Sequence, residues 1–385
     1  MPSNFIFDEL DNHLTYDFDD VFIKKTFFTE YGQLWGYGAN FIGQLGNGTT
    51  NDEISPIQLG SSTILWKDIG LRFRSSAGIK SDGTLWTWGE NNQGQLGDGT
   101  TTNKSSPVQI GSATNWKQVA CGYYFMATIK KDNTLWTWGN NRYGGLGDGT
   151  IVKKSSPIQV GSLTDWKQVS CGYYHISAVK TNGTLWTCGY NSAGQLGDGT
   201  LVHNSSPIQV GSLTDWKSVA CGYSWTLALK TDGTLWGWGT NWWGQLGNGI
   251  SNNYYVSPIQ IGSLTDWKQI STGYYHSAAT KTDGTLWIWG LGTYARLGLG
   301  DLTSKSSPTQ VGALNNWKQV SCIYNNTAAI KTDGTLWICG DNTWGLLDDG
   351  SAGSYGVSSF IQVGSLTNWK RVESSYVDIL ALKYY

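Results

Sequence analysis

Hydrophobic and polar positions alternate in short runs along most of this chain, and the same runs return about every 50 residues. Within one unit, 166–215, this alternation predicts four β-strands, near 167–171, 175–180, 184–189 and 207–211. Asn182-Gly183 separates the second strand from the third, and other units have Asp-Gly there. Such a pair is the strongest short signal for a β-hairpin, because both turn residues need positive φ. Each unit is therefore predicted to be a four-stranded antiparallel sheet, with strands a, b, c and d in chain order.

Three residue patterns mark the repeat. A Leu-Trp pair recurs in one register seven times and Trp-Lys seven times, at steps of 50 to 52 residues, and a proline that we place at the start of strand d occurs six times. Proline suits an outer edge strand, where no N–H is needed for pairing. The Leu-Trp tryptophans are Trp35, Trp86, Trp136, Trp186, Trp236, Trp287 and Trp337, and the Trp-Lys tryptophans are Trp66, Trp116, Trp166, Trp216, Trp267, Trp317 and Trp369. Seven copies of about 50 residues predict an all-β, seven-bladed β-propeller.

The two ends of the repeat region complement each other. The first partial unit, 32–60, holds only strands c and d, and the last, 369–383, holds only a and b. Pairing the two halves would complete a seventh blade and close the ring, whereas an open solenoid would need capping ends. We therefore expect a propeller over residues 31–385 and a separate arm over residues 1–30.

The motifs WKQVSCGYYHISAVK, TDGTLWTWG and NxxGQLGDGT…SSPIQVG resemble the regulator-of-chromosome-condensation repeat family of seven-bladed propellers. The resemblance covers about residues 31–385, and the repeats resemble uncharacterised bacterial and phage-encoded members more than the eukaryotic exchange factor. The family's best-known member is a guanine-nucleotide exchange factor with a wedge inserted in one blade and a basic tail. Here the Leu-Trp steps differ by one residue at most, which leaves no such wedge, and the basic tail is missing. Exchange activity is therefore the less favoured alternative.

Composition narrows the function. Aromatic residues make up 14% of the chain and the net charge is only −2, which excludes a disordered protein and argues against a nucleic-acid or anionic-membrane surface. There is no apolar run of membrane-spanning length and no secretory signal at the start, so a cytoplasmic location is expected, with incorporation into a virion as an alternative.

Candidate chemistry is sparse. The glycine-rich c–d loops lack the Gly-Lys-Ser/Thr of a phosphate loop, and their Asp98, Asp148 and Asp198 supply one carboxylate each, too few for calcium. The six cysteines have no Cys-x-x-Cys spacing and are interpreted as buried free thiols; they are Cys121, Cys171, Cys188, Cys221, Cys322 and Cys339. We expect no metal, no cofactor and no enzymatic activity. The lysine before each hairpin turn is expected to be scaffold, with its charged head in water.

Function is therefore expected where the repeats differ. The a–b and c–d loops share one face, and one blade there, 216–261, is rich in aromatics. The ligand-binding candidates are Trp225, Trp242, Trp243, Tyr254, Tyr255, Tyr143, Tyr294, Trp344, His175 and His276. Clustered aromatics with polar neighbours suit a protein loop or a carbohydrate ring. The alternative is that these rings only pack between neighbouring loops.

The arm holds seven acidic residues against Lys24 and Lys25, and six of the ten phenylalanines of the chain. A solvated tail would lack those rings, so Phe18, Phe22, Phe27 and Phe28 are candidates for binding an assembly, a second copy or the propeller itself. The sequence thus predicts a non-enzymatic recognition or assembly module. A surface-displayed adhesin or a phage-particle component anchored by the arm is the alternative.

Overall fold

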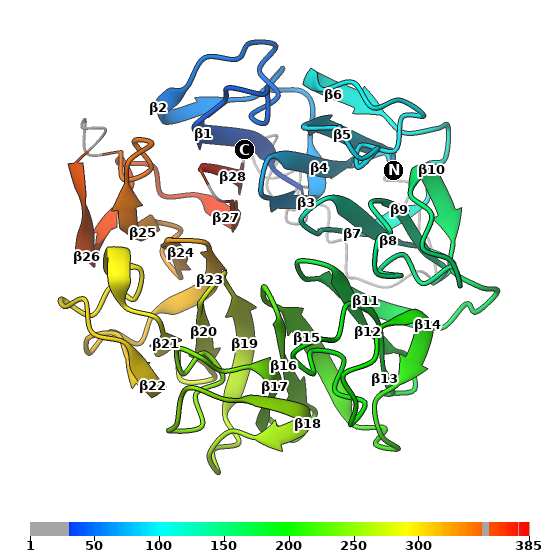
Figure 1. Cartoon of the computed structure of the whole chain (residues 1–385). Coiled ribbons are helices and arrows are strands. Elements are labelled where there is room, and N and C mark those ends of the chain that lie inside the picture. Colours follow the sequence, from blue (N-terminus) through cyan, green and yellow to red (C-terminus); the bar gives the residue numbers. More distant parts are fainter. Residues whose placement is uncertain (1–30, 349–353, 376, 385) are drawn as a thin grey trace, which may run out of the picture.

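Seven four-stranded antiparallel sheets surround a central channel in the computed structural model of this protein, as predicted (Figure 1). The structure describes residues 31–348, 354–375 and 377–384. The arm predicted over residues 1–30, with Phe18, Phe22, Phe27 and Phe28, lies outside the described residues. Within the described part, the only helical element is the short 3-10 turn η1 (Thr293–Ala295).

Each blade places its strands in sequence from the channel outward. Strand a lies innermost: β3 (Trp66–Arg72), β7 (Trp116–Cys121), β11 (Trp166–Cys171), β15 (Trp216–Cys221), β19 (Trp267–Thr272), β23 (Trp317–Ile323) and β27 (Trp369–Ser374). Strand b follows: β4 (Ser75–Lys80), β8 (Phe125–Lys130), β12 (His175–Lys180), β16 (Trp225–Lys230), β20 (His276–Lys281), β24 (Asn326–Lys331) and β28 (Asp378–Lys383). Strand c is third: β5 (Leu85–Gly89), β9 (Leu135–Gly139), β13 (Leu185–Gly189), β17 (Leu235–Thr240), β21 (Leu286–Gly290), β25 (Leu336–Asn342) and β1 (Gln33–Gly38). Strand d is outermost: β6 (Lys104–Gln109), β10 (Lys154–Gln159), β14 (Asn204–Gln209), β18 (Tyr254–Gln260), β22 (Lys305–Gln310), β26 (Ser354–Gln362) and β2 (Glu53–Gln58).

The two ends of the repeat region close the ring. The seventh sheet has the order β2-β1-β28-β27, so both halves contribute two strands, as predicted (Figure 1). β1 pairs with β28 from Gln33 opposite Lys383 to Gly38 opposite Asp378. This antiparallel pairing leaves no open sheet edge between the first and last repeats.

Strand d starts earlier than the sequence predicts. In the third blade it begins at Asn204, and Pro207 is its fourth residue rather than its first. The pairing of β13 with β14 shifts register between Thr187 and Gly189, opposite the proline. A proline inside a strand is tolerated at such a bulge on an edge strand, because no ladder N–H is required of it.

The apolar core lies between neighbouring blades. Ala77 and Ile79 of the first blade, for example, pack with Trp116 and Val119 of the second. Seven such clusters are formed, one at each blade interface. Each blade therefore depends on both neighbours to bury its two faces, which is how a propeller of twisted sheets satisfies its apolar side chains.

In six blades the lysine at the end of strand b lies close to two tryptophan rings. In the third blade the Lys180 Nζ lies 4.9 Å from the ring centroid of Trp166 and 4.3 Å from that of Trp186, and 3.4 Å from a carboxylate oxygen of Asp165. The expected scaffold role is thus seen as cation–π packing. The expectation of a solvated head is wrong for the buried lysines of this set, which are Lys180, Lys230, Lys281 and Lys331.

Innermost strands are joined across blade boundaries by side-chain amides. Gln118 donates its Nε2 to the Val169 carbonyl at 3.0 Å and accepts the Val169 N–H at 3.1 Å, and Gln168 repeats both bonds with Val219 at 2.9 Å. These two-way bonds fix the register between β7, β11 and β15.

The closing seam replaces glutamine by charged residues. Arg371 of β27 donates to the Ile69 carbonyl at 3.1 Å and forms an ion pair with Asp68 of β3. Asp68 in turn accepts the Val119 N–H at 2.8 Å. The blade made from both chain ends is therefore held to the first blade by an ion pair that no other described seam has.

Candidate functional site

The a–b and c–d loops lie on one face of the propeller, as predicted; this surface is called the loop face below. The Tyr174 ring of an a–b loop contacts those of Tyr143 and Tyr190 in c–d loops, at centroid distances of 5.1 and 6.4 Å. The b–c turns and d–a links share the opposite surface, called the turn face. There the Thr181 N–H donates to the Asp165 carbonyl at 2.8 Å. The two faces thus have separate sets of loops.

A ring of aromatic side chains surrounds the channel at the loop face. Its described members come from the a–b loops of six blades, and we call them the tyrosine ring: Phe73, Tyr123, Tyr173, Tyr223, Tyr274 and Tyr324. Successive ring centroids are 4.0 to 4.5 Å apart. Most of these rings, with Arg72, Arg74 and Gly273, line a cavity of about 270 Å³.

Local sequence explains why these rings point to the channel. Gly122 donates its N–H to the Phe125 carbonyl at 2.8 Å, so that Tyr123 and Tyr124 form a two-residue loop. A Cβ on Gly122 would lie 2.5 Å from the Phe125 ring, which explains the glycine at this point. The same Gly-Tyr-Tyr sequence occurs at 172–174 and 273–275. Each such loop supplies one ring to the channel mouth and one to the c–d side.

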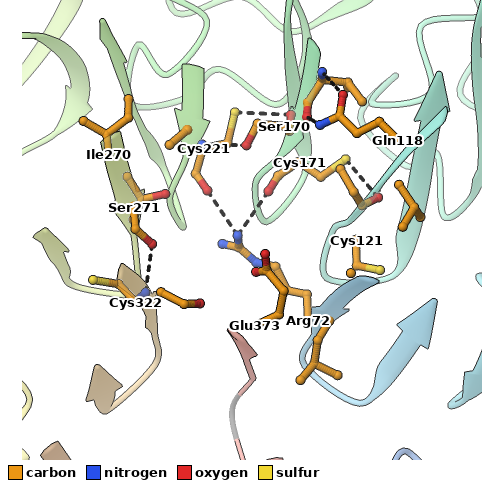
Figure 2. Close-up of a pocket in the computed structure, with 18 of the residues that line it drawn as sticks. Arg72, Gln118, Cys121, Ser170, Cys171, Cys221, Ile270, Ser271, Cys322 and Glu373 are labelled. Carbon is orange, nitrogen blue, oxygen red and sulfur yellow. Dashed lines mark hydrogen bonds between the residues drawn. The ribbon is translucent and has the colours of Figure 1, made fainter. Parts of the chain in front are cut away.

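Arg72 crosses the channel beneath the tyrosine ring. Its Nη1 donates to the carbonyls of Cys171 and Cys221, both at 3.1 Å, and Figure 2 shows the guanidinium between these two strands with Glu373 close by. Burial lowers the pKa of Arg72, but a guanidinium stays charged at neutral pH. The cavity therefore combines aromatic walls with a cationic floor, which suits a carboxylate or a planar side chain inserted from a partner.

Desolvation also acts on the tyrosine ring. Partial burial, and then hydrogen bonding with Tyr124, raises the pKa of Tyr123, and burial with hydrogen bonding to Tyr123 raises that of Tyr173. Both phenols are therefore neutral hydrogen-bonding groups at physiological pH. They can meet a partner without adding negative charge to the mouth.

Three sequence candidates are buried. Trp225, His175 and His276 begin strand b of their blades and pack beneath the a–b loops, with Trp225 only 1% exposed. Their expected exposure is wrong because side chains at the first position of strand b point into the space over a glycine three residues earlier; the Gly172 Cβ position lies 2.2 Å from the His175 ring. The other members of this register are buried as well: Ser75, Phe125, Asn326 and Asp378.

Both histidines bond to the next blade. The Nε2 of His175 lies 3.1 Å from the Thr226 hydroxyl, and that of His276 lies 2.8 Å from the Thr327 hydroxyl. The Thr226 hydroxyl donates to the Gln195 carbonyl, so His175 is assigned as the Nε2–H donor. Burial, and then Arg72, lowers the pKa of His175 to about 3. These groups serve blade packing.

Exposed aromatics remain in the c–d loop of the fourth blade. Trp242 and Trp243 are 52% and 46% exposed, and Tyr254 at the end of that loop is 47% exposed. Tyr255 instead packs inward, and its hydroxyl accepts from Asn248 at 2.7 Å. Ile250 of the same loop is also exposed. Trp242, Trp243, Ile250 and Tyr254 are called the aromatic patch.

Two of the remaining candidates pack against other aromatic rings, and one is exposed to solvent. Tyr143 contacts Tyr190 at 4.6 Å and Tyr174 at 5.1 Å, and Trp344 contacts Phe41 at 5.8 Å. These two rings pack between neighbouring loops, as the alternative interpretation holds. Tyr294 in η1 is exposed.

The tyrosine ring and Arg72 were not among the sequence candidates. Their signal was present, because residues 73, 123, 173, 223, 274, 324 and 376 are all aromatic in the aligned repeats. A residue that recurs in every blade is interpreted as structural. Only the ring geometry shows that these side chains meet at one mouth. Arg72 stands where most blades have glycine, which is the kind of deviation that could have been noticed.

The described part of the chain lacks the side-chain groups of a metal site and the helices of a membrane span. It contains no group of three or more His, Cys, Asp or Glu side chains placed to hold a metal ion. None of its helical segments is long and apolar enough to span a bilayer. All six cysteines are buried and unpaired.

Seven four-stranded blades closed by both chain ends define a repeat β-propeller. The family model described as RCC1-like domain matches residues 74–375, and the chain belongs to this family. The ultraviolet-B receptor UVR8 of Arabidopsis thaliana is 38% identical over 80 residues, which is 20% of this chain and 18% of the receptor. The chain thus matches less than a fifth of that curated relative.

Solved structures of the same fold cover most of the chain. Human WBSCR16 has a TM-score of 0.80 at 20% identity, covering 91% of this chain and 98% of that one. Prp20p of Saccharomyces cerevisiae, reported with its binding properties to Gsp1p and histones, also has a TM-score of 0.80, at 18% identity with 92% of both chains covered. At these identities the likeness shows the fold.

Proposed function

We propose that this protein is a non-enzymatic recognition propeller that binds a protein partner through its loop face. The observation that carries the proposal is the aromatic patch, where two adjacent tryptophans are about half exposed on one blade. Tryptophan and tyrosine are the residue types most enriched among binding hot spots. The tyrosine ring lies on the same face and offers a second contact for a partner.

Two features favour recognition over catalysis. The histidines nearest the channel are buried in blade interfaces, and the pKa of His276 lies well below its usual range because of burial and then Arg296. The cavity at the tyrosine ring has aromatic walls and a guanidinium already bonded to carbonyls. Prp20p, a propeller of this fold, was reported with protein ligands. A protein partner is therefore preferred to a carbohydrate.

The test uses the full chain as bait, with the captured partner identified by mass spectrometry and its dissociation constant then measured. Trp242→Ala/Trp243→Ala should weaken binding about 10- to 100-fold, as expected for loss of a hot spot of roughly 1–3 kcal/mol. Thermal unfolding should stay unchanged, because both rings are largely outside the core.

Ile151→Ala/Val152→Ala is the matched control, since both side chains are exposed in the c–d loop of another blade. This control should bind like the original protein. Unchanged binding by the tryptophan variant would contradict the proposal. Loss of glycan binding on an array, with protein binding intact, would instead assign the patch to carbohydrate.

A further inference from the structure

The turn face has its own channel mouth, and lysines lie around it. The second residue of every innermost strand is a lysine: Lys67, Lys117, Lys167, Lys217, Lys268, Lys318 and Lys370. Five of them are exposed, and Lys67 and Lys370 are half-buried. Innermost strands begin on the turn face and surround the channel (Figure 1), so the backbone positions of these lysines lie around one opening.

Positive charge exceeds negative charge at this mouth. Lys67, Lys117 and Lys370 line a depression of about 720 Å³ together with Arg371 and Glu373. Arg371 and Glu373 form an ion pair with each other, at 3.1 Å, and Arg371 also pairs with Asp68, so they add little net charge. Lys67 and Lys117 therefore supply positive charge that this ion pair does not balance.

Acidic residues elsewhere on the turn face are already engaged. Asp82 accepts the Thr84 N–H at 2.9 Å and the Thr84 hydroxyl at 2.6 Å, and the turns at Asp132, Asp232, Asp283 and Asp333 repeat this bonding. Asp165, Asp215 and Asp266 directly precede the innermost strands, but their carboxylates are paired with the buried lysines of strand b. The carboxylates named here thus bind groups other than Lys67, Lys117, Lys167, Lys217, Lys268 and Lys318.

The chain enters the propeller beside this mouth. Gly32 and Trp66 exchange two backbone hydrogen bonds, at 2.9 and 2.8 Å, and Lys67 is the next residue of β3. Residues 1–30 precede this point directly and carry seven acids against two lysines, a net charge of −5. Asp17, Asp19 and Asp20 are 12 to 15 residues away along the chain. At about 3.3–3.6 Å per residue, such a length spans roughly 40–50 Å when extended.

The turn face also offers apolar contacts. Leucines of four d–a links are exposed there: Leu163, Leu213, Leu264 and Leu314. The segment 1–30 holds six phenylalanines. Apolar side chains on both sides gain by burying each other's surface. Charge and apolar complementarity thus point to the same pair of surfaces.

We propose that the lysine-ringed mouth of the turn face is the docking site of the acidic segment 1–30 of the same chain. Single exposed ion pairs contribute only about 0–1 kcal/mol each. Tethering next to the mouth gives the segment an effective concentration on the order of millimolar, so a few such pairs and the phenylalanine contacts suffice. The binding occupies the turn face and leaves the loop face open to a partner.

Zero-length carbodiimide cross-linking of the full chain tests this docking. Peptide mapping should find Asp17, Asp19 or Asp20 joined to Lys67, Lys117 or Lys370 in the monomer fraction. In a mixture of unlabelled and nitrogen-15-labelled protein, these links should join chains of one label. Raising the ionic strength to about 1 M, which shortens the Debye length to roughly 3 Å, should reduce them.

Two variants sharpen the test. Lys67→Glu/Lys117→Glu should lose the links to Lys370 and expose the segment to protease several-fold faster, whereas Lys153→Glu, an exposed lysine of the loop face, should change neither. Asp17→Asn/Asp19→Asn/Asp20→Asn should give the same loss of protection without altering any described blade. Links only between differently labelled chains would assign the mouth to a second copy. Links as frequent to Lys153 as to Lys67, or none at all, would overturn the docking site.

Discussion

At the scale of residues, a pair of positions decides what fills the space under each a–b loop. Where strand b begins with a large ring, as at Phe125 and Trp225, the residue three positions earlier is glycine, because a Cβ there would lie 2.4–2.5 Å from the ring. The first blade reverses the sizes, with Arg72 at the glycine position and Ser75 at the ring position. The small serine leaves Arg72 room to extend into the channel and bond to two carbonyls.

The buried histidines should make the protein less stable in mild acid. The pKa of His175 is lowered to about 3 by burial and then Arg72, whereas an unfolded histidine titrates near 6.5. Between these values only the unfolded chain binds the proton, so stability falls as the pH falls through this window. We expect urea denaturation to show that, between pH 7 and pH 5, the free energy of unfolding of His175→Gln falls by about 2 kcal/mol less than that of the original protein. Equal slopes for His175→Gln and the original protein would contradict the assignment.

Two tryptophans of one blade should contribute very different amounts to the free energy of unfolding. Trp225 is 1% exposed within the cluster of the fourth and fifth blades, so Trp225→Ala should cost about 3–5 kcal/mol of unfolding free energy. Trp242→Ala should stay within about 0.5 kcal/mol, because half of that ring is in water. Chemical denaturation of both variants checks the order, and a larger loss for Trp242→Ala would show that the aromatic patch is a packing element.

At the scale of elements, the seams between innermost strands explain how blades keep register. A glutamine that both donates to and accepts from one backbone position, as Gln168 does with Val219, satisfies that residue without any charge. At the closing seam Arg371 can only donate, to the Ile69 carbonyl, and at the next seam Asp68 can only accept, from the Val119 N–H. The ion pair between Arg371 and Asp68 joins these two positions across the closing seam.

Breaking this ion pair should destabilise the ring. Arg371→Ala leaves the Asp68 carboxylate buried without its cation, a change that typically costs about 3–5 kcal/mol. Gln319→Ala, which removes amide bonds at 3.0 and 3.3 Å from another seam, should cost about 1–3 kcal/mol. The double variant Asp68→Gln/Arg371→Gln recreates the neutral pattern and should recover most of the loss. Denaturation midpoints test this order; a double variant no more stable than Arg371→Ala would show that the seam geometry does not accept glutamine.

At the scale of the whole molecule, closure joins the two ends of the repeat region in one sheet. β27 and β28 fill one half of this blade, and β28 pairs with β1 along its full length. Clusters on both sides of the blade, including Trp369 toward the sixth blade and Leu382 toward the first, depend on these strands. The ring therefore behaves as one cooperative unit rather than as an open stack of repeats.

Removing residues 369–385 should open the ring. The deletion would expose the edge of β1 and apolar surface on two neighbouring blades, and exposed edges pair between molecules. Size-exclusion chromatography should show aggregation, and calorimetry should show loss of the single cooperative transition. A monomeric truncated protein with the original melting temperature would refute closure.

The thiols should be inert until the ring unfolds. Burial raises the pKa of Cys188 and Cys322 to about 12, and the thiolate is the reactive form. Titration with a thiol reagent should find little reaction in the native protein and six thiols in denaturant without reductant. A shortfall of two would reveal a disulfide and contradict the assignment of free cysteines.

Blade count, strand order and ring closure can all be predicted from the amino-acid sequence. Those features follow from local chemistry repeated at a fixed period: the Asn182-Gly183 turn, strand alternation, and half-units that complete each other. Which side chains meet depends instead on how the blades pack against one another. The sequence places Tyr173 and His175 two residues apart near one a–b loop, but it does not say which surface a neighbouring blade covers. The next blade buries His175 against Thr226, and the ring brings tyrosines some fifty residues apart to 4.0–4.5 Å. The physical reason is that contacts across a closed ring depend on its curvature, which no single repeat encodes.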